Sequence, residues 1–289
     1  MQNPNNHQCG FGRITSSFSL WFPVLKPHPN AALLLICFPY AGGGTAVFRA
    51  WPDALTEAIE LRVAQLPGRG PRLREKPLVR MGTLIETLVE ALCPLLDRPF
   101  AFFGHSLGAI VAFEVACRLR DRGLVPAHLF VSGNIAPQLS DPAFPIHGLP
   151  DDAFLRELEE LNGMPQAVLD SKELLEILLP VVRADFTLLE NYTYDSRPPL
   201  HCPITAFGGL EDPRTTKSGL ESWRTQTIES FDVLMLEGDH FFLDTKRPLL
   251  LDAIASRLLR KKTLCLPVAG RARAGALDQT WHSPRSARA

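Results

Sequence analysis

The segment GHSLG at residues 104–108 has the pattern G-x-S-x-G and holds the residues of this sequence best suited to chemistry. It lies between a short apolar run and a helical pattern, the context in which a strand turns sharply into a helix. The turn strains its central residue, Ser106, and Gly104 and Gly108 lack side chains that would collide with the strand and helix. The helix directs its N-terminal amides toward developing negative charge. The motif therefore predicts a serine nucleophile for acyl transfer.

A serine hydroxyl is a weak nucleophile at neutral pH and needs an adjacent base. Where the serine lies on such a turn, the acid and then the histidine follow it along the chain. Of the eight histidines, His240 and His282 lie late enough, while the others precede the required position or lie in the turn itself. His282 falls in a tail that we expect to be disordered, and His240 follows the last predicted strand through a short loop. We predict His240 as the base, with an ordinary surface histidine as the alternative.

The acid is expected in the loop after the penultimate strand, where the sequence reads GGLEDP at residues 208–213. Asp212 is the first choice, because the following proline favours an extended backbone and its short side chain can accept a hydrogen bond from imidazole. Such an acid orients the ring and balances imidazolium charge. Glu211, Asp239 and Asp244 are the alternatives.

An oxyanion hole needs two amides, and the turn supplies one of them, the N–H of Leu107. The glycine-rich segment FPYAGGG at residues 38–44 follows an early predicted strand and can supply the second, because its glycines let the backbone approach a ligand. A phosphate loop is the other interpretation of such glycines, but the pattern G-x-x-x-x-G-K-[ST] is absent.

Apolar runs alternate with amphipathic helical patterns along most of the chain, which is typical of parallel strands joined by crossover helices. We therefore predict the α/β class and the α/β-hydrolase fold: a mostly parallel central sheet with flanking helices. The predicted strands are residues 32–38, 61–66, 100–103, 127–132, 203–208 and 232–236. The predicted helices between them are residues 51–59, 81–96 and 109–120.

Residues 150–194 interrupt this alternation with helical patterns at 153–161, 172–179 and 181–192 and no strand between them. An all-helical insertion after a sheet strand is typical of a lid over an active site. Additional packing helices without a gating role are the alternative.

Both ends of the chain differ from the part between them. Residues 1–27 are polar with scattered aromatics, which predicts a loosely ordered arm that docks through Trp21 and Phe22. Residues 261–289 carry six basic residues against one acid, which predicts a disordered basic tail. Residues 28–260 are then expected to form one catalytic domain, since 289 residues that are 46% hydrophobic can bury one large core.

The overall composition excludes several classes of partner. A formal net charge of −1 argues against nucleic acid or an anionic membrane, which require basic surfaces. No secretory signal and no run of about 18 apolar residues is found, so we expect a cytoplasmic protein. The six cysteines form no C-x-x-C pair and no cluster with metal-ligand spacing. We expect no metal site and reduced cysteines, with Cys37 and Cys117 in the core.

Five motifs together resemble those of the type II thioesterases of nonribosomal peptide and polyketide synthesis. The resemblance runs from about residue 21 to residue 260 and covers neither terminal stretch. It departs at Gly70, where family members often have an acidic residue, which puts a local loop contact in doubt. The motifs are FPYAGGG (38–44), QLPGRG (65–70), GHSLG (104–108), GGLEDP (208–213) and GDHFFL (238–243).

The resemblance implies a helical lid and a free-standing editing enzyme, which hydrolyses stalled or wrong acyl groups from the phosphopantetheine arm of acyl or peptidyl carrier proteins. It places the catalytic triad at Ser106, Asp212 and His240. The oxyanion amides fall at Leu107 and at Ala41, with Tyr40 as the alternative to Ala41. The scheme requires no metal and no bound cofactor, because phosphopantetheine arrives on the carrier. We expect a monomer whose partners are carrier protein domains and small acyl thioesters.

Three other functions remain open at this point. A small-molecule carboxylesterase or lipase would use the same fold and triad on an oxygen ester. An acyltransferase would pass the acyl group to an alcohol or amine instead of water. A binding protein on a hydrolase scaffold would lack catalysis, although all three triad positions are filled in this sequence.

Overall fold

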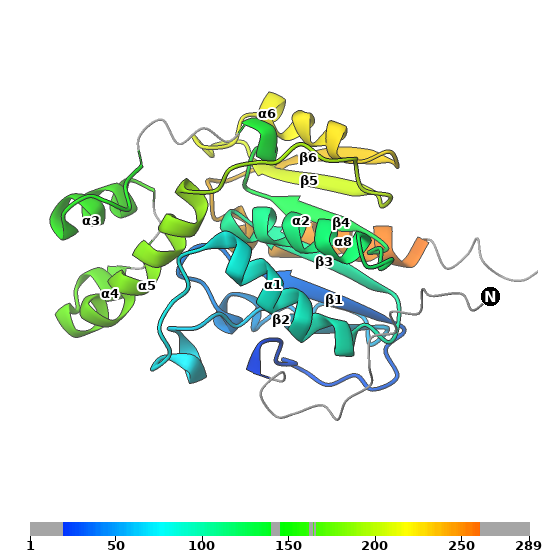
Figure 1. Ribbon diagram of the computed structural model, residues 1–289, viewed down its shortest axis with the longest axis horizontal. Coiled ribbons are helices and arrows are strands. Elements are labelled where there is room, and N and C mark those ends of the chain that lie inside the picture. The colour runs from blue at the N-terminus through cyan, green and yellow to red at the C-terminus, as the bar shows by residue number, and fades with distance from the viewer. Residues whose placement is uncertain (1–19, 140–144, 162–163, 165, 261–289) are drawn as a thin grey trace, which may run out of the picture.

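A six-stranded parallel sheet in the order β2-β1-β3-β4-β5-β6 forms the centre of the molecule (Figure 1). The computed structural model describes residues 20–139, 145–161, 164 and 166–260. Every neighbouring pair of strands is parallel, which confirms the predicted α/β-hydrolase class of sheet. The strands are β1 (Leu33–Phe38), β2 (Ile59–Val63), β3 (Phe100–His105), β4 (Leu129–Ser132), β5 (Ile204–Gly209) and β6 (Phe231–Leu236).

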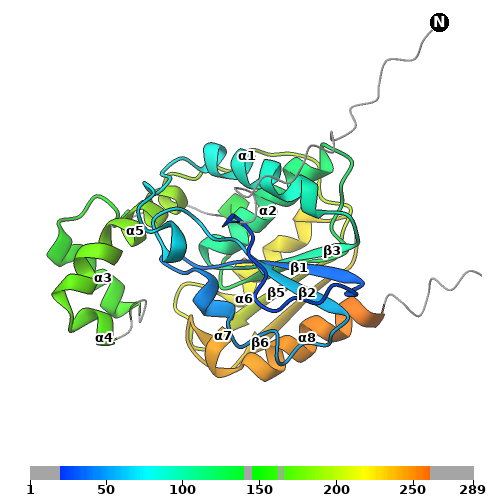
Figure 2. The ribbon, with the colours of Figure 1, turned by 90° about the horizontal axis from the view of Figure 1, so that it is seen from below.

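The continuous apolar run of β1 is explained by burial on both faces of the sheet. Leu34 and Ile36 pack on one face with the helices α1 (Met81–Leu92) and α2 (Leu107–Arg120). Leu35 and Cys37 point to the other face, which α8 (Arg247–Arg260) covers. Figure 2 shows α1 and α2 on one side of the sheet and α8 on the other. Side chains alternate between faces along a strand, so a strand covered twice must be apolar throughout.

The predicted helix at residues 51–59 is wrong. A short 3-10 helix, η2 (Thr45–Phe48), comes first, turns follow, and β2 begins at Ile59. The Trp51 ring is fully buried, and its centroid lies 4.9 Å from that of Phe48 and 4.9 Å from that of Phe103. The Ala58 carbonyl accepts hydrogen bonds from the amides that begin β1. Tertiary packing and sheet pairing thus outweigh the local helical pattern.

Helix α8 was not among the predicted elements, although its sequence carries a signal for it. Leu250, Leu251, Ile254 and Leu258 recur at helical spacing, and all four are buried against the second face of the sheet. Further short elements are η3 (Gly70–Arg72), η4 (Cys93–Leu95), η5 (Pro137–Leu139), α6 (Lys217–Glu221), η6 (Ser222–Gln226) and α7 (Phe242–Thr245).

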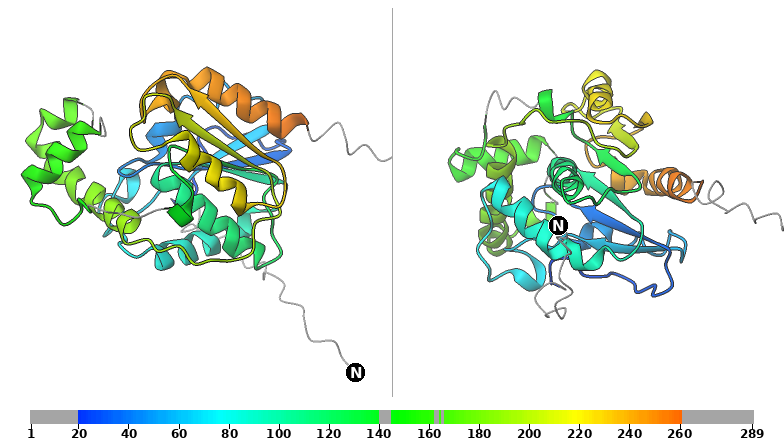
Figure 3. Two further views of the ribbon diagram at one scale, coloured as in Figure 1. Left: turned by 90° about the horizontal axis from the view of Figure 1, so that it is seen from above. Right: turned by 45° about the vertical axis from the view of Figure 1, so that its right-hand side comes forward.

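The insertion between β4 and β5 is helical, and no strand occurs in the described part of residues 150–194. Its helices α3 (Asp151–Glu160), α4 (Gln166–Leu169) and α5 (Lys172–Glu190) extend from one end of the sheet (Figures 1 and 3). They share a small apolar core that includes Phe154, Leu158 and Phe186. The insertion is helical, as predicted, and we call it the lid; its role as a cover over the site stays a prediction.

The two helices predicted at 172–179 and 181–192 form one helix, α5, with Pro180 inside it. Proline lacks the amide that would bond to the carbonyl of residue 176, and it usually bends or ends a helix. Pro180 and Glu176 are both exposed, so water can bind the carbonyl that is left without its donor.

The predicted N-terminal arm lies mostly, and the predicted basic tail entirely, outside the described residues. Of the arm, Phe22 is fully buried in the core beside α1 and α2, and the Arg72 guanidinium lies 3.7 Å from the centre of the Trp21 ring. Cys37 and Cys117 are buried, as predicted. Across the described ranges, no helix combines the length and apolar character needed to cross a bilayer.

Candidate active site

Ser106 lies on a strained turn between β3 and α2. Its backbone has φ 55° and ψ −119°, and within the described ranges no other residue except glycine has a positive φ. Its amide donates to the Ser132 carbonyl at 2.8 Å, and its carbonyl accepts from Asn134 Nδ2 at 3.1 Å. Such a conformation costs about 1–3 kcal/mol, which these contacts with the end of β4 and the loop after it must offset.

Gly104 and Gly108 are required because the chain crosses itself closely here. A Cβ added at Gly104 would lie 2.0 Å from the Gly108 carbonyl oxygen, and one at Gly108 would lie 2.0 Å from that of Phe38. Both contacts are with backbone, so no side chain can move aside. The two glycines bring the first turn of α2 against the strand that carries the serine and against the end of β1.

Gly108→Ala is expected to lower the free energy of unfolding by about 3 kcal/mol, because its Cβ would overlap fixed backbone. Gly82 is the matched control, since it lies in the first turn of α1 and a Cβ there meets nothing within 4 Å. Gly82→Ala is expected to raise stability by up to about 1 kcal/mol. Urea unfolding of both variants measures the difference. Equal stability of the two would contradict the close approach of α2 to β1.

His240 and Asp212 meet although 28 positions separate them along the chain. His240 Nδ1 lies 2.8 Å from Asp212 Oδ2, and the two side chains follow β6 and β5 respectively. The centre of the His240 ring is 5.0 Å from that of His105, the residue before Ser106. Ser106, Asp212 and His240 are 8%, 7% and 8% exposed. The structure therefore brings the histidine and its carboxylate partner beside the serine turn.

Asp212 accepts two further hydrogen bonds, from the Arg214 amide at 2.9 Å and from Thr215 Oγ1 at 2.7 Å. Burial would raise the pKa of Asp212, but these donors, the His240 hydrogen bond and the His240 charge together hold it below its ordinary value of 3.8. The carboxylate is thus ionised at neutral pH. It accepts from Nδ1 and leaves Nε2 of His240 as the basic nitrogen.

The alternative acids lie elsewhere. Glu211 is exposed, and Asp239 accepts a hydrogen bond from the Phe241 amide at 2.9 Å. Asp244 lines a cavity with Tyr40, and partial burial raises the pKa of its carboxyl. Thr215, which the sequence interpretation missed, lies three residues after Asp212. Its spacing matches the short turns in which a hydroxyl bonds an aspartate, a signal too common to single it out.

His105 is a second buried histidine whose position the sequence interpretation did not use. Its Nδ1 lies 2.9 Å from Ser132 Oγ, and its ring packs against those of Tyr40 and Phe242. Burial, followed by the nearby His240 charge, holds the pKa of His105 well below the usual value. A neutral ring beside that of His240 supports it by packing and adds no competing charge.

In the loop after β1, the amides of Gly42 and Gly43 are already engaged in hydrogen bonds. Gly42, with φ 79°, donates to Asp185 Oδ2 at 2.7 Å, and Gly43 donates to the Tyr40 carbonyl at 2.9 Å. Among the described residues, the amides of Tyr40, Ala41 and Leu107 have no acceptor. These are the amides that the sequence predicted for an oxyanion hole, and both Tyr40 and Ala41 remain available.

A cavity of about 490 Å³ adjoins this loop. One wall is the loop itself from Tyr40 to Gly44, and the lid forms another wall with Met164, Val168, Leu178 and Val182.

A metal site would need a cluster of ligating side chains, and the part of the chain that the structure describes contains no group of three or more His, Cys, Asp or Glu residues suited to one.

The model of the thioesterase domain family matches residues 34–261. Linear gramicidin dehydrogenase LgrE of Brevibacillus parabrevis is 46% identical over 244 residues, which cover 83% of this chain and 93% of that protein. Gramicidin S biosynthesis protein GrsT of Aneurinibacillus migulanus is 45% identical over 229 residues, which cover 79% of this chain and 90% of that protein.

Solved structures give the same result. RedJ, a thioesterase from the prodiginine biosynthetic pathway in Streptomyces coelicolor, has 42% sequence identity and a TM-score of 0.76, over 80% of this chain and 92% of its own. The matches agree with the parallel sheet and with the resemblance inferred from the motifs. The chain belongs to the thioesterase domain family and is a hydrolase that acts on thioesters.

Proposed function

We propose that the chain is a type II thioesterase of nonribosomal peptide or polyketide biosynthesis, which hydrolyses acyl groups from the phosphopantetheine thiol of acyl or peptidyl carrier proteins. The observation that carries the proposal is the His240–Asp212 hydrogen bond beside the Ser106 turn, in a chain of the thioesterase family. The names of two relatives, one in gramicidin S biosynthesis and one in prodiginine biosynthesis, support the choice of pathway class.

In the first half of the proposed cycle, Ser106 Oγ attacks the thioester carbonyl carbon while His240 Nε2 takes the hydroxyl proton. Asp212 holds the ring through Nδ1 and balances the positive charge that forms on it. When the tetrahedral intermediate collapses, the C–S bond breaks and the proton on His240 passes to the leaving sulfur. The carrier departs with a free thiol, and the acyl group remains on Ser106.

In the second half, water attacks the acyl-serine and gives its proton to His240. Collapse returns that proton to Ser106 Oγ and releases the carboxylic acid. In both halves the oxyanion accepts from the Leu107 amide and from Ala41, with Tyr40 as the alternative. The N-terminal end of α2 adds a favourable field, because Leu107 is its first residue. The scheme uses no metal or resident cofactor, since phosphopantetheine enters as part of the substrate.

The cavity of about 490 Å³ beside the oxyanion loop is the proposed acyl site; its lining also includes Arg49, Asp244 and Arg247, and does not include the triad side chains. Apolar lid side chains form one wall, and the loop that carries the Ala41 amide forms another. An acyl chain placed there would bury apolar surface while its carbonyl stays next to the amides. The lid would then set the size of the acyl group that the enzyme accepts.

The test uses acylated holo carrier proteins and mass spectrometry of the phosphopantetheine arm. Wild type is expected to restore the free thiol, whereas Ser106→Ala leaves the acyl group in place. Matched oxygen esters and acyl thioesters should show a preference for the thioester, because its carbonyl is more electrophilic and thiolate leaves readily. A preference for free esters, with no activity on acylated carriers, would contradict the proposed substrate class.

Transfer of the acyl group to an acceptor other than water would give a different product. An acyltransferase would yield an ester or amide when an alcohol or amine is added, so free acid as the main product supports hydrolysis.

One relative carries the name of a dehydrogenase, an activity that would require a bound dinucleotide. The glycine-rich loop of this chain does not match the dinucleotide-binding pattern G-x-G-x-x-G. With Gly42 and Gly44 as the first two glycines, the third would fall at residue 47, which is Val47.

That the enzyme is cytoplasmic and monomeric stays a prediction.

A further inference from the structure

A buried ion pair joins lid helix α5 to the loops at the edge of the sheet. The Arg69 guanidinium donates to both carboxylate oxygens of Asp185, at 2.6 and 2.7 Å. The two side chains are 6% and 1% exposed, and 116 positions separate them. Arg69 belongs to the QLPGRG motif, to which the proposed reaction assigns no step.

Both partners of this pair also bond to the backbone of the oxyanion loop. Asp185 Oδ2 accepts from the Gly42 amide at 2.7 Å, and Arg69 Nη1 donates to the Gly43 carbonyl at 2.9 Å. Gln65 extends the network, because its Oε1 accepts from the Thr45 amide at 3.1 Å and its Nε2 donates to the Arg69 carbonyl at 2.9 Å. Two positions of the loop and Thr45, the first residue of η2, are thus fixed by side chains from outside the loop.

Stability alone does not explain such a pair, because replacing a buried salt bridge with two well-packed apolar residues often leaves the free energy of unfolding unchanged or raises it. What apolar residues cannot supply is an acceptor for the Gly42 amide and a donor for the Gly43 carbonyl. Gly42 has a positive φ of 79°, and a Cβ there would lie 2.8 Å from Val182 Cγ2, a side chain of α5. The loop is therefore held tightly against the lid helix in one conformation.

We propose that Asp185, together with Arg69, is a positioning residue for the oxyanion hole. By binding the Gly42 amide and fixing the backbone at Gly43, the pair leaves the Ala41 and Tyr40 amides to face the reacting carbonyl. The lid then contributes to the chemical step through α5, and not only by covering the substrate. This inference rests on the proposed function, since it assigns a role within the same acyl-transfer site.

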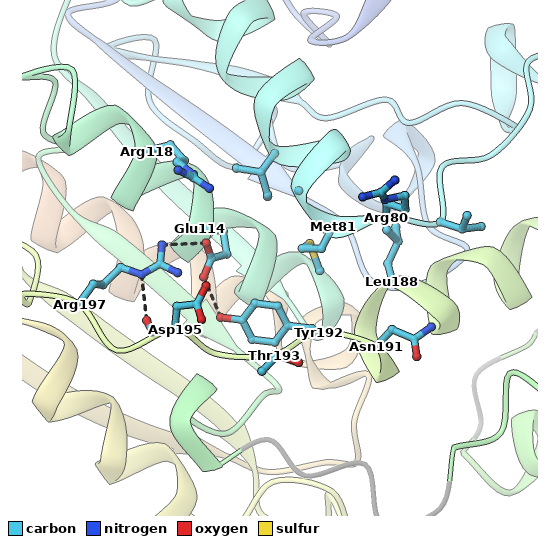
Figure 4. A pocket seen from close by; sticks show the side chains of 13 residues that line it. Arg80, Met81, Glu114, Arg118, Leu188, Asn191, Tyr192, Thr193, Asp195 and Arg197 are labelled. Atoms are coloured by element: carbon cyan, nitrogen blue, oxygen red, sulfur yellow. Dashed lines mark hydrogen bonds and ion pairs between the residues drawn. The ribbon is translucent and has the colours of Figure 1, made fainter.

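A second buried network supplies a matched control far from the loop. Glu114 of α2 accepts from Tyr192 Oη at 2.7 Å and from Arg197 Nη1 at 3.0 Å, so it ties the segment that follows α5 to the body. Figure 4 shows these side chains around a separate cavity of about 400 Å³. Glu114→Gln weakens a buried anchor of the segment that follows α5 without touching the oxyanion loop.

The experiment compares Asp185→Asn, the double variant Arg69→Met with Asp185→Leu, and Glu114→Gln. Two rates are measured per folded molecule: kcat on acylated carrier protein, and labelling of Ser106 by a fluorophosphonate, whose phosphoryl oxygen occupies the oxyanion position. Both rates are expected to fall about 10- to 100-fold in Asp185→Asn and in the double variant, with KM little changed. Glu114→Gln should lower the unfolding midpoint but keep both rates.

A structural role alone would give another pattern. If the double variant regains wild-type stability and its rates return as well, the positioning role is wrong. The same conclusion follows if Glu114→Gln slows labelling as much as Asp185→Asn does. Failure of the proposed function is separate, because wild type itself would then leave acylated carriers intact while Ser106 labelling still reports on the loop.

Discussion

Replacing Ser106 with alanine is expected to lower kcat on an acylated carrier protein by about 10⁶-fold, the loss typical when a serine nucleophile is removed from such a triad. No other hydroxyl is placed on the strained turn between β3 and α2, where φ is 55°. Without it the acyl-enzyme cannot form, and what remains is the effect of the oxyanion amides on direct attack by water. Thiol release, followed by mass spectrometry over long incubations, measures the residual rate.

The control for this prediction is the combination with His240→Ala. Ser106 and His240 act as one unit, so the double variant should be no slower than Ser106→Ala alone. Its unfolding midpoint is expected to fall, because His240→Ala takes one hydrogen-bond donor from the buried Asp212 carboxylate, so the rates are compared per folded molecule. Losses that multiply in the double variant would show that His240 acts elsewhere and would remove it from the proposed mechanism.

The parts of the site that the sequence predicts are those defined by local pattern. The serine turn needs Gly104 and Gly108 within one short segment, and six apolar runs mark the six strands. The order of nucleophile, acid and histidine then selects His240. The family assignment is confirmed, whereas the catalytic roles of these residues stay predictions.

The parts that the sequence does not predict depend on contacts between distant segments. The pattern at residues 51–59 is helical, yet burial of Trp51 and pairing of β2 with β1 prevent a helix. Asp185 is one more charged residue in a helical pattern until α5 is seen to bury it against Arg69. The sequence did contain one signal for Asp185: it is a charged residue among apolar neighbours that are buried in the helix, namely Val182, Ala184 and Phe186.

The choice of Asp212 over its neighbours shows the same division. The sequence places Asp212 and Glu211 in the loop after the penultimate strand and favours Asp212, with Asp239 and Asp244 after the last strand as weaker alternatives. Only the fold shows that the Asp212 side chain lies 2.8 Å from His240 Nδ1. Three donors on one carboxylate also explain why it stays charged when it is 7% exposed, a state that costs several kcal/mol without such partners.

Asp212→Asn is expected to lower kcat by about 10⁴-fold while the fold is kept. An asparagine amide can donate to His240 Nδ1, which stabilises the tautomer with the proton on Nε2. That nitrogen then cannot accept the proton of Ser106. Steady-state deacylation of a carrier protein at neutral pH measures the loss. Thr215→Val, which removes one donor to Asp212 but keeps the carboxylate on the ring, should lose far less activity.

Stability gives an independent check on the same carboxylate. The pKa of Asp212 is lower in the folded protein than in the unfolded chain, where it is near 3.8. Its contribution to stability is therefore complete above that value and is lost as the pH falls through the folded-state pKa. Between about pH 5 and pH 2, the unfolding free energy of wild type should fall more steeply than that of Asp212→Asn. Parallel curves would mean that the carboxylate gains nothing from His240, Thr215 and the Arg214 amide, and the hydrogen-bonded pair would then not hold the ring for catalysis.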